Sequence, residues 1–330
     1  MKQGLPQINK CKVVILSITY NQSQYIEDTL NGFVTQQTDF PFICCVFDDA
    51  STDGEQDVLK QWIDNHCNSE KVEIYNHPLA IILMAPDKNN SNCIYAIHLH
   101  KVNLFGKPEK QELINYWKQF GEYIAICEGD DYWIDSLKLQ KQVDFLDKNI
   151  DYGLVRTNIN QYIQKEDQII EDFFSNGNWT RIKDTFYDYI IHGWYAAPCS
   201  WLYRAIYIEK YKKLQQKLQN ENCFTGDILI LLCIAENSKI KYFPESTAMY
   251  RILDKSASHF NSFERAWSFF IKNKNTRTFF AKNESWSFRL KYLCIASYEH
   301  LIFILRHKKV NFLFKWVIEV CRDFKKLFHL

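Results

Sequence analysis

"FICCVFDDASTDGEQDVLKQWID" spans residues 42–64 and contains the order of elements that decides the fold. It opens with an apolar run, as expected for a strand that is buried on both faces of a sheet. Asp48 and Asp49 follow at once. Ser51 or Thr52 can then cap a helix with an acidic first turn, so we predict that a helix begins there. A strand, an acidic turn and a helix in this order predict one unit of a parallel α/β sheet.

The same alternation recurs on both sides of this stretch. "KVVILSITY" (12–20) is a second apolar run, and a helical stripe follows it from Ile26 to Val34. "KVEIYN" (71–76) and "YIAICEGDD" (123–131) are predicted to be further strands. The repeated order of strand and helix predicts an α/β fold with a mostly parallel central sheet that is flanked by helices.

Two segments do not follow this alternation of strand and helix. Residues 77–121 contain short apolar pieces and a Gly-Pro loop, so we predict an insertion over the sheet edge or the mouth of the site. From residue 256 to 330 the pattern is helical, aromatic and basic. We therefore predict a catalytic domain over 1–255 and a helical C-terminal appendage over 256–330.

The composition narrows the class of protein. The 40 basic and 39 acidic residues leave a net charge of +1, which argues against a broad surface for nucleic acid. The 11 cysteines include no CxxC pair, and several lie in apolar runs, which favours a reducing compartment. The sequence shows neither the apolar core of a signal peptide nor a run of roughly 20 apolar residues, so we expect a cytoplasmic protein.

Acidic side chains follow two of the predicted strands. Asp48 and Asp49 follow one strand, and Glu128, Asp130 and Asp131 follow another. The carboxyl ends of parallel strands form the ligand crevice of such sheets. Crowded carboxylates repel each other unless a cation such as Mg²⁺ or Mn²⁺ lies between them, and these cations commonly bridge to phosphates. The alternative is that both clusters are ordinary turn and helix-cap residues.

Four stretches together carry a resemblance to a known family. They resemble, in order, the family 2 glycosyltransferases with the GT-A fold, and the similarity extends from about residue 12 to about residue 260. The stretches are "ILSITYNQSQYIEDTLNGFVTQ" (15–36), "VFDDASTDG" (46–54), "YIAICEGDDYWIDSLKLQKQVDFL" (123–146) and "TGDILILLCIAENSKIKYFPESTAMYR" (225–251). The resemblance implies a Rossmann-like nucleotide-binding half and Mn²⁺ or Mg²⁺ as the cofactor. It also implies an inverting transfer of a sugar from a nucleotide-sugar to a hydroxyl of a glycan acceptor, in bacterial surface polysaccharide synthesis.

The resemblance also implies roles for residues that bind the nucleotide-sugar. Tyr20 takes the place of the residue that packs on the base, with Asn21 beside it. Asp49 matches the carboxylate that contacts the base or the ribose. Arg251 either pairs with phosphate or simply ends a strand.

A second set of roles concerns the metal. Glu128-Gly129-Asp130 stands where the family has its DxD motif, with Glu in place of the first Asp. Glu128 and Asp130 are expected to bind the nucleotide-sugar, and Asp130 and Asp131 the metal. His259 either closes over the metal and diphosphate or lies in a loop.

Two further residues concern the reaction and the acceptor. Asp227 matches the family's general base, although it is also well placed to cap the helix that follows it. Trp133 is expected to stack on an acceptor sugar, with burial in the core as the alternative.

The C-terminal residues 301–330 are locally basic, with seven Lys or Arg against two acidic residues. Their apolar positions fall on one helical stripe, which is typical of a helix that contacts a membrane surface or packs on its own domain. Two other functions remain open for the whole chain. One is a nucleotidyltransferase acting on a sugar phosphate, which usually needs a glycine-rich phosphate loop that the first strand lacks. The other is a non-catalytic membrane-associated protein on the same scaffold.

Overall fold

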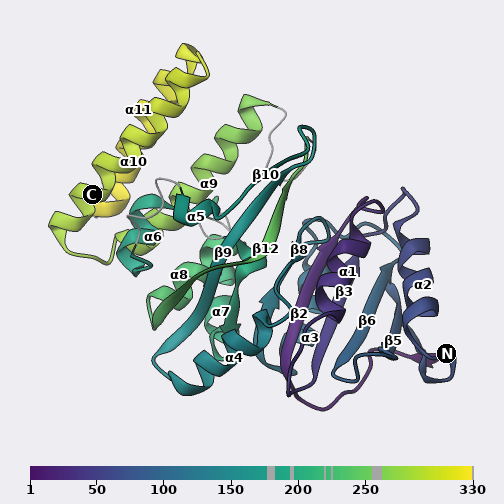
Figure 1. Ribbon diagram of the computed structural model, residues 1–330. Helices are drawn as coiled ribbons and strands as arrows, with labels where there is room; N and C mark the ends of the chain where they lie inside the picture. Colours follow the sequence, from purple (N-terminus) through teal and green to yellow (C-terminus); the bar gives the residue numbers. More distant parts are fainter. Residues whose placement is uncertain (177–182, 194–196, 219–220, 224–225, 255–261, 329–330) are drawn as a thin grey trace. The chain divides into compact units, whose positions relative to one another are not determined.

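The computed structural model describes the chain except for residues 177–182, 194–196, 219–220, 224–225, 255–261 and 329–330 (Figure 1). The chain forms two compact units that alternate along the sequence. Unit 1 comprises Met1–Thr180, Ala196–Ile206 and Ile240–Ile252, and unit 2 comprises Arg181–Tyr195, Tyr207–Lys239 and Leu253–Leu330. A functional boundary at residue 255 stays a prediction.

Unit 1 is a mixed β-sheet with helices packed on it (Figure 1). The strand order is β1-β4-β5-β6-β3-β2-β7-β11-β9-β12-β8, and β10 pairs with β9. The strands are β1 (Lys2–Gln3), β2 (Cys11–Thr19), β3 (Phe42–Asp48), β4 (Glu73–Asn76), β5 (Ala80–Pro86), β6 (Cys93–His100), β7 (Gly121–Ile126), β8 (Tyr132–Trp133), β9 (Tyr152–Ile163), β10 (Gln168–Ile170), β11 (Leu202–Arg204) and β12 (Lys239–Ile252). The helices of this unit are α1 (Ile26–Val34), α2 (Glu55–His66), α3 (Pro108–Lys118), α4 (Lys138–Lys148) and α5 (Phe173–Asn176).

The centre of the sheet is parallel. Strands β6, β3, β2 and β7 lie side by side in this order, and each neighbouring pair runs in the same direction. Every residue of β3 is buried, as expected for a strand that is covered on both faces. The predicted α/β class with a mostly parallel central sheet is therefore confirmed.

The segment 77–121, which the sequence analysis treats as an insertion, supplies an inner strand of the sheet. It forms an antiparallel hairpin of β5 and β6, and β6 then pairs in parallel with β3. The helix α3 follows within the same segment. The strand β6 was hard to recognise because the polar letters of His98 and His100 interrupt its apolar run, although both side chains are buried.

The helix predicted from Ser51 or Thr52 begins later, at Glu55. The N-cap is Gly54, whose φ of 92° lies in the left-handed region that favours glycine. The stretch 239–252 is one continuous strand, β12.

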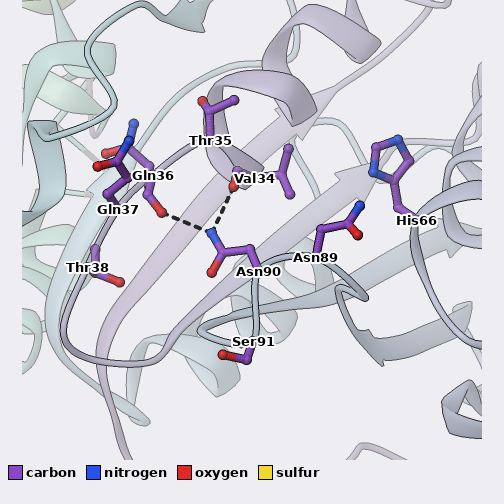
Figure 2. Close-up of a pocket in the computed structure, with 9 residues that line it drawn as sticks. All are labelled: Val34, Thr35, Gln36, Gln37, Thr38, His66, Asn89, Asn90 and Ser91. Atoms are coloured by element: carbon purple, nitrogen blue, oxygen red, sulfur yellow. Dashed lines mark hydrogen bonds between the residues drawn. The ribbon is translucent and has the colours of Figure 1, made fainter.

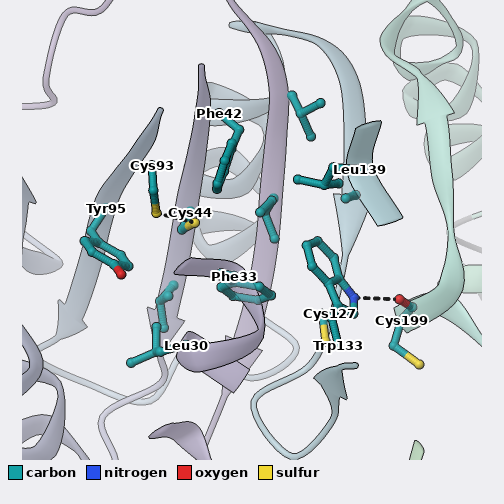
Figure 3. Packing of buried hydrophobic residues seen from close by; sticks show 14 of the residues in the cluster. Leu30, Phe33, Phe42, Cys44, Cys93, Tyr95, Cys127, Trp133, Leu139 and Cys199 are labelled. Carbon is teal, nitrogen blue, oxygen red and sulfur yellow. Dashed lines mark hydrogen bonds between the residues drawn. The ribbon is translucent and has the colours of Figure 1, made fainter. Parts of the chain in front are cut away.

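The core of unit 1 lies where helices cover the parallel strands (Figure 3). Phe33 of α1 and Trp133 of β8 meet there edge to face, with 4.9 Å between their ring centroids. Cys44 and Cys93 are buried in the same cluster as free thiols, as the apolar setting of such residues predicts.

Unit 2 is helical in the part that the structure describes. Its helices are α6 (Phe186–His192), α7 (Ile208–Leu218), α8 (Asp227–Ala235), α9 (Phe263–Ala281), α10 (Trp286–Arg306) and α11 (Leu313–Phe328), with a 3₁₀ turn η5 (Val310–Phe312) before the last one. The predicted helical C-terminal region is therefore confirmed. Within the described residues, none of these helices is both long and apolar enough to cross a bilayer.

A lysine is fully buried beside the core of unit 1. The Lys138 Nζ donates a hydrogen bond of 2.7 Å to Gln142 Oε1 and lies 4.4 Å from the centroid of the Trp133 ring. Burial lowers the pKa of Lys138 from 10.5 to about 7. Because the unfolded chain keeps the proton that the folded chain releases, stability is expected to rise with pH between about 7 and 10.5.

We predict that Lys138→Met removes this pH dependence. Between pH 7 and pH 9 the free energy of unfolding of the wild type should rise by about 1–2 kcal/mol more than that of the variant. Urea unfolding at both pH values measures the difference. Lys60→Met, at an exposed lysine, is the control and should behave like the wild type. Equal pH dependence of Lys138→Met and the wild type would contradict the prediction.

Candidate functional site

Three loops meet at the edge where the parallel strands β2, β3 and β7 end, which we call the carboxyl edge. The Asp49 N–H donates to the Thr19 carbonyl, which ties the loop after β3 to the end of β2. The Gly129 N–H donates to the Ile18 carbonyl, which ties the loop after β7 to the same strand. The predicted crevice residues of unit 1 are thus brought to one edge of the sheet.

A cavity of about 500 Å³ lies elsewhere in unit 1 (Figure 2). Its lining segments 34–38 and 89–91 directly precede β3 and β6, so it opens near the amino ends of these strands. Asn90 Nδ2 spans it and donates to the carbonyls of Val34 and Gln36. The described lining contains no carboxylate, so the cavity lacks the chemistry of the carboxyl edge.

Asp49 is buried and has three polar partners. Its Oδ1 accepts from Leu104 N at 2.7 Å and lies 3.2 Å from His100 Nδ1, and its Oδ2 accepts from Lys110 Nζ at 2.8 Å. Burial opposes ionisation, but the hydrogen bonds from Lys110 and Leu104 outweigh it and lower the pKa of Asp49. All three partners come from the segment 77–121, which therefore shapes this part of the site.

The loop after β2 presents Tyr20 and Asn21. The Tyr20 side chain is 46% exposed, so its ring is available for stacking. Asn21 has a φ of 55°, a left-handed conformation that asparagine tolerates. Its backbone N–H donates to Ser51 Oγ, and its Oδ1 accepts from the N–H of Thr52. The loops after β2 and β3 are thereby joined.

Glu55 is a site residue that the sequence analysis missed. It is fully buried, and its carboxylate accepts from Thr19 Oγ1, from the Gln22 N–H and from Ser51 Oγ. Burial raises its pKa. In the sequence, Glu55 is only one acidic residue in the first turn of a helix. No local pattern indicates that its side chain turns inward and joins two loops.

The acidic loop, residues 128–131, combines three carboxylates with a glycine. Asp131 is buried, and its Oδ1 accepts from the Arg251 N–H at 2.8 Å. Burial raises the pKa of Asp131 well above its usual range, and the negative charges of Asp130 and Glu128 raise it further. Burial also raises the pKa of Asp130, although a hydrogen bond with Gln22 partly offsets this. Mutual repulsion therefore makes this loop a place where a cation would be favoured.

The donor atoms of the acidic loop fit a hard divalent cation. Within the described residues, no group of three or more His, Cys, Asp or Glu side chains is placed to hold a metal by itself. Mg²⁺ is usually held by one or two carboxylates together with substrate phosphates, and Glu128 and Asp130 can supply such carboxylates. Asp131 has one oxygen occupied by Arg251, and His259 lies outside the described residues.

Arg251 connects the acidic loop to the rest of unit 1. Its Nε donates to the Asp130 carbonyl, one Nη to Asp28 Oδ2 at 2.7 Å, and the other to Gln164 Oε1. The guanidinium also lies 4.5 to 5.6 Å from the centroids of three aromatic rings, those of Tyr25, Tyr132 and Tyr162. The side chain is 6% exposed and does more than end a strand. Phosphate binding by Arg251 stays a prediction.

Trp133 lies in the core rather than on an open wall (Figure 3). It is 4% exposed, and its Nε1 donates to the Cys199 carbonyl at 2.8 Å. This placement matches the alternative that the sequence analysis left open, burial in the core. Acceptor stacking by Trp133 stays a prediction without support from the packing.

Asp227 belongs to unit 2, where it is the first residue of α8. The N-cap is Gly226, so Asp227 occupies the first turn of the helix instead of the cap position. A carboxylate in the first turn is stabilised in its ionised form by the helix dipole. Its role as general base stays a prediction.

These features define an α/β protein of the GT-A class, with an acidic loop at the carboxyl edge. A model of the family described as Glycosyl transferase family 2 matches residues 14–79. The resemblance found in the sequence is thus confirmed, and the match to the family model is confined to these residues.

Comparison with solved structures supports the same fold. Residues 1–349 of S. aureus TarS, in complex with UDP-GlcNAc, match with a TM-score of 0.57 at 16% identity, covering 96% of this chain and 81% of that one. The same TarS segment in complex with UDP matches with a TM-score of 0.50, covering 90% and 71%. At this identity the match establishes the GT-A fold alone.

Two curated relatives match part of the chain. The uncharacterized protein Rv1520 of Mycobacterium tuberculosis is 33% identical over 135 residues, which cover 41% of this chain. TuaG of Bacillus subtilis, whose name proposes a glycosyltransferase of teichuronic acid biosynthesis, is 28% identical over 134 residues. The matches span only 31% and 41% of the lengths of these two relatives.

We predict that Gly129→Ala distorts the acidic loop. A Cβ at this position would lie 2.3 Å from Thr19 Oγ1 and 2.6 Å from Gln22 Oε1. Because Thr19 is buried in β2, relief of this overlap should cost about 1–3 kcal/mol of unfolding free energy. Gly106→Ala is the matched control, since a Cβ there meets open space and only its φ of 72° is strained. Chemical unfolding compares the two variants, and a smaller loss for Gly129→Ala than for Gly106→Ala would contradict the prediction.

We predict that Arg251→Lys destabilises unit 1 by about 2–3 kcal/mol, because lysine cannot reproduce the three-sided hydrogen bonding of the guanidinium. Thermal unfolding without ligand measures this loss, with Arg265→Lys at an exposed position as the control. A variant that melts like the wild type but loses donor binding would instead assign Arg251 to phosphate.

Proposed function

We propose that this protein is an inverting glycosyltransferase that moves a sugar from a nucleotide-sugar to a hydroxyl of a glycan acceptor. The observation that carries the proposal is the meeting of three loops, two of them acidic, at the carboxyl edge of a GT-A sheet. Support comes from TarS, which has the same fold and was solved with UDP-GlcNAc.

In this proposal the loops after β2 and β3 hold the nucleotide. The exposed ring of Tyr20 packs on the base, and Asn21 lies beside it. Asp49, kept ionised by Lys110, accepts a hydrogen bond from the base or the ribose. Because its carboxylate is already fixed by the protein, little side-chain entropy is lost when the nucleotide binds.

In this proposal the acidic loop would hold Mn²⁺ or Mg²⁺, which would supply positive charge for the diphosphate. Asp130 and Asp131 are the proposed metal carboxylates, and His259 is a further proposed ligand. Glu128 is a proposed contact of the nucleotide-sugar, and Arg251 is a proposed phosphate contact. When bound, the cation would neutralise the charge that develops on the leaving nucleoside diphosphate. The raised pKa values of Asp130 and Asp131 are consistent with a loop that gains from a nearby cation.

The reaction itself needs one base. The Asp227 carboxylate takes the proton of the acceptor hydroxyl while the acceptor oxygen attacks the anomeric carbon. The new bond forms on the face opposite the bond between the anomeric carbon and the diphosphate oxygen. That bond breaks, and the nucleoside diphosphate leaves with its electron pair. The configuration at the anomeric carbon is therefore inverted. An acceptor contact by Trp133 would require its ring to leave the core position that the structure gives it.

The setting of the reaction is also a proposal. The name of TuaG refers to teichuronic acid biosynthesis, and we infer a related use here, with a glycan or lipid-linked glycan of the cell surface as acceptor. The reaction would take place on the cytoplasmic side, and the catalytic domain would comprise residues 1–255.

We predict that Asp130→Asn and Asp227→Asn inactivate the enzyme in different ways. A panel of UDP-, GDP- and dTDP-sugars with Mn²⁺ first identifies the donor by its thermal shift. Asp130→Asn should lose the metal-dependent part of this shift. Asp227→Asn should keep the shift but lower kcat by about 100-fold or more, as expected for loss of a general base.

Asp144→Asn, at an exposed position on α4, is the control and should keep full activity. An Asp227→Asn variant with wild-type kcat would remove this residue from the reaction. Release of pyrophosphate from a nucleoside triphosphate and a sugar phosphate would instead favour the nucleotidyltransferase. A chain that binds no donor from the panel would contradict the proposed function.

A further inference from the structure

The last helix of unit 2, α11, packs with a polar side facing inward. Asp323 is 3% exposed, and its carboxylate lies 2.6 Å from the Nζ of Lys274, which is buried in α9. Glu319 pairs with the same Nζ at 3.1 Å. Trp316 Nε1 donates to the Ser297 carbonyl of α10. Both acidic side chains of α11 are therefore used within unit 2.

Four apolar side chains of α11 are exposed, whereas Leu327 is buried. Phe314 is 74% exposed, Val317 47%, Ile318 42% and Phe324 42%. At 3.6 residues per turn these positions form one stripe, on the side opposite to Trp316 and Asp323. A contiguous stripe of exposed apolar side chains on the surface of a folded unit is typical of a surface that contacts a partner or a membrane.

The charges beside the stripe are mostly positive. Lys315, Arg322, Lys325 and Lys326 follow one margin of it, while the two acids turn inward to Lys274. Glu319 and Glu221 partly offset Arg322 and Lys326. Lys308 and Lys309, just before the helix, add two further cations.

The exposed apolar stripe and the basic residues beside it together indicate what kind of partner can bind α11. A second copy docked on the same stripe would bring two basic margins together and repel. An anionic lipid surface satisfies both features, since phenylalanine and valine insert among acyl chains while lysines meet the headgroup charges. Nucleic acid would use the lysines but would leave the apolar stripe in water.

We propose that α11 is an interfacial helix that docks unit 2 on an anionic membrane surface. Phe314, Val317, Ile318 and Phe324 enter the lipid, and Lys315 and Lys325 lie at the headgroups. The helix lies in the plane of the interface. The inference is independent of the proposed glycosyl transfer, because it concerns a different surface and is measured by binding alone.

Co-sedimentation of the full chain with vesicles tests this inference. Vesicles of phosphatidylcholine with about 30% phosphatidylglycerol should bind the protein, and pure phosphatidylcholine should bind it at least about tenfold more weakly. Raising the salt from about 0.1 to about 0.5 M should reduce binding, because it screens the lysines.

Two double variants separate the contributions. Phe314→Ser with Phe324→Ser should lower binding at least about tenfold. Lys315→Gln with Lys325→Gln should remove the preference for the anionic lipid. Phe105→Ser with Ile206→Ser, at exposed apolar positions of unit 1, is the matched control and should bind like the wild type. Circular dichroism melting confirms that each variant keeps its fold.

Several outcomes would overturn the inference. Absence of vesicle binding by the folded wild type would remove the membrane role. A dimer in light scattering that Phe314→Ser with Phe324→Ser dissociates, without vesicle binding, would assign the stripe to a second copy. Equal binding to both kinds of vesicle would remove the headgroup contact. Donor binding, measured on the same samples, reports separately on the proposed enzyme.

Discussion

The geometry of the acidic loop depends on one buried cation, Arg251. The loop holds three carboxylates, and burial together with the charges of Asp130 and Glu128 raises the pKa of Asp131. Arg251 gives its backbone N–H to Asp131 and its Nε to the carbonyl of Asp130. A guanidinium stays charged when buried, and its planar group of donors can bind on several sides at once. The end of β12 therefore sets the shape of a loop that follows β7.

The carboxylates at the carboxyl edge divide into two kinds. Asp49 and Asp131 are buried and already bound by protein donors, yet their pKa values move in opposite directions. Lys110 contributes a full positive charge to Asp49, while Asp131 receives a backbone N–H and faces two negative neighbours. The charge of Asp49 is thus already balanced by Lys110, and the acidic loop is the place where an added cation would gain most.

Much of the fold follows from local sequence pattern, but the site does so only in part. The strand at 42–48 and the acidic loop could be predicted, because apolar runs and clustered acids are local signals. The inner strand β6 could not, because His98 is buried by its tertiary setting. Glu55 was missed for a similar reason, since its partners lie on two other loops. Trp133 shows the limit most clearly: its position beside the acidic loop gave no information about whether its ring faces solvent or core.

The orientation of α11, like the geometry of the acidic loop, depends on a buried positive charge. The sequence period identifies one apolar and one polar side of this helix but not which side turns inward. The contacts of Lys274 decide this, because its buried ammonium would be left unpaired, at a cost of several kcal/mol, if both acidic side chains turned away from it. Glu319 and Asp323 must therefore face α9, and the apolar stripe is left on the surface. An exposed stripe that a buried ion pair holds outward is a stable feature of the fold, available for a membrane surface without any rearrangement of unit 2.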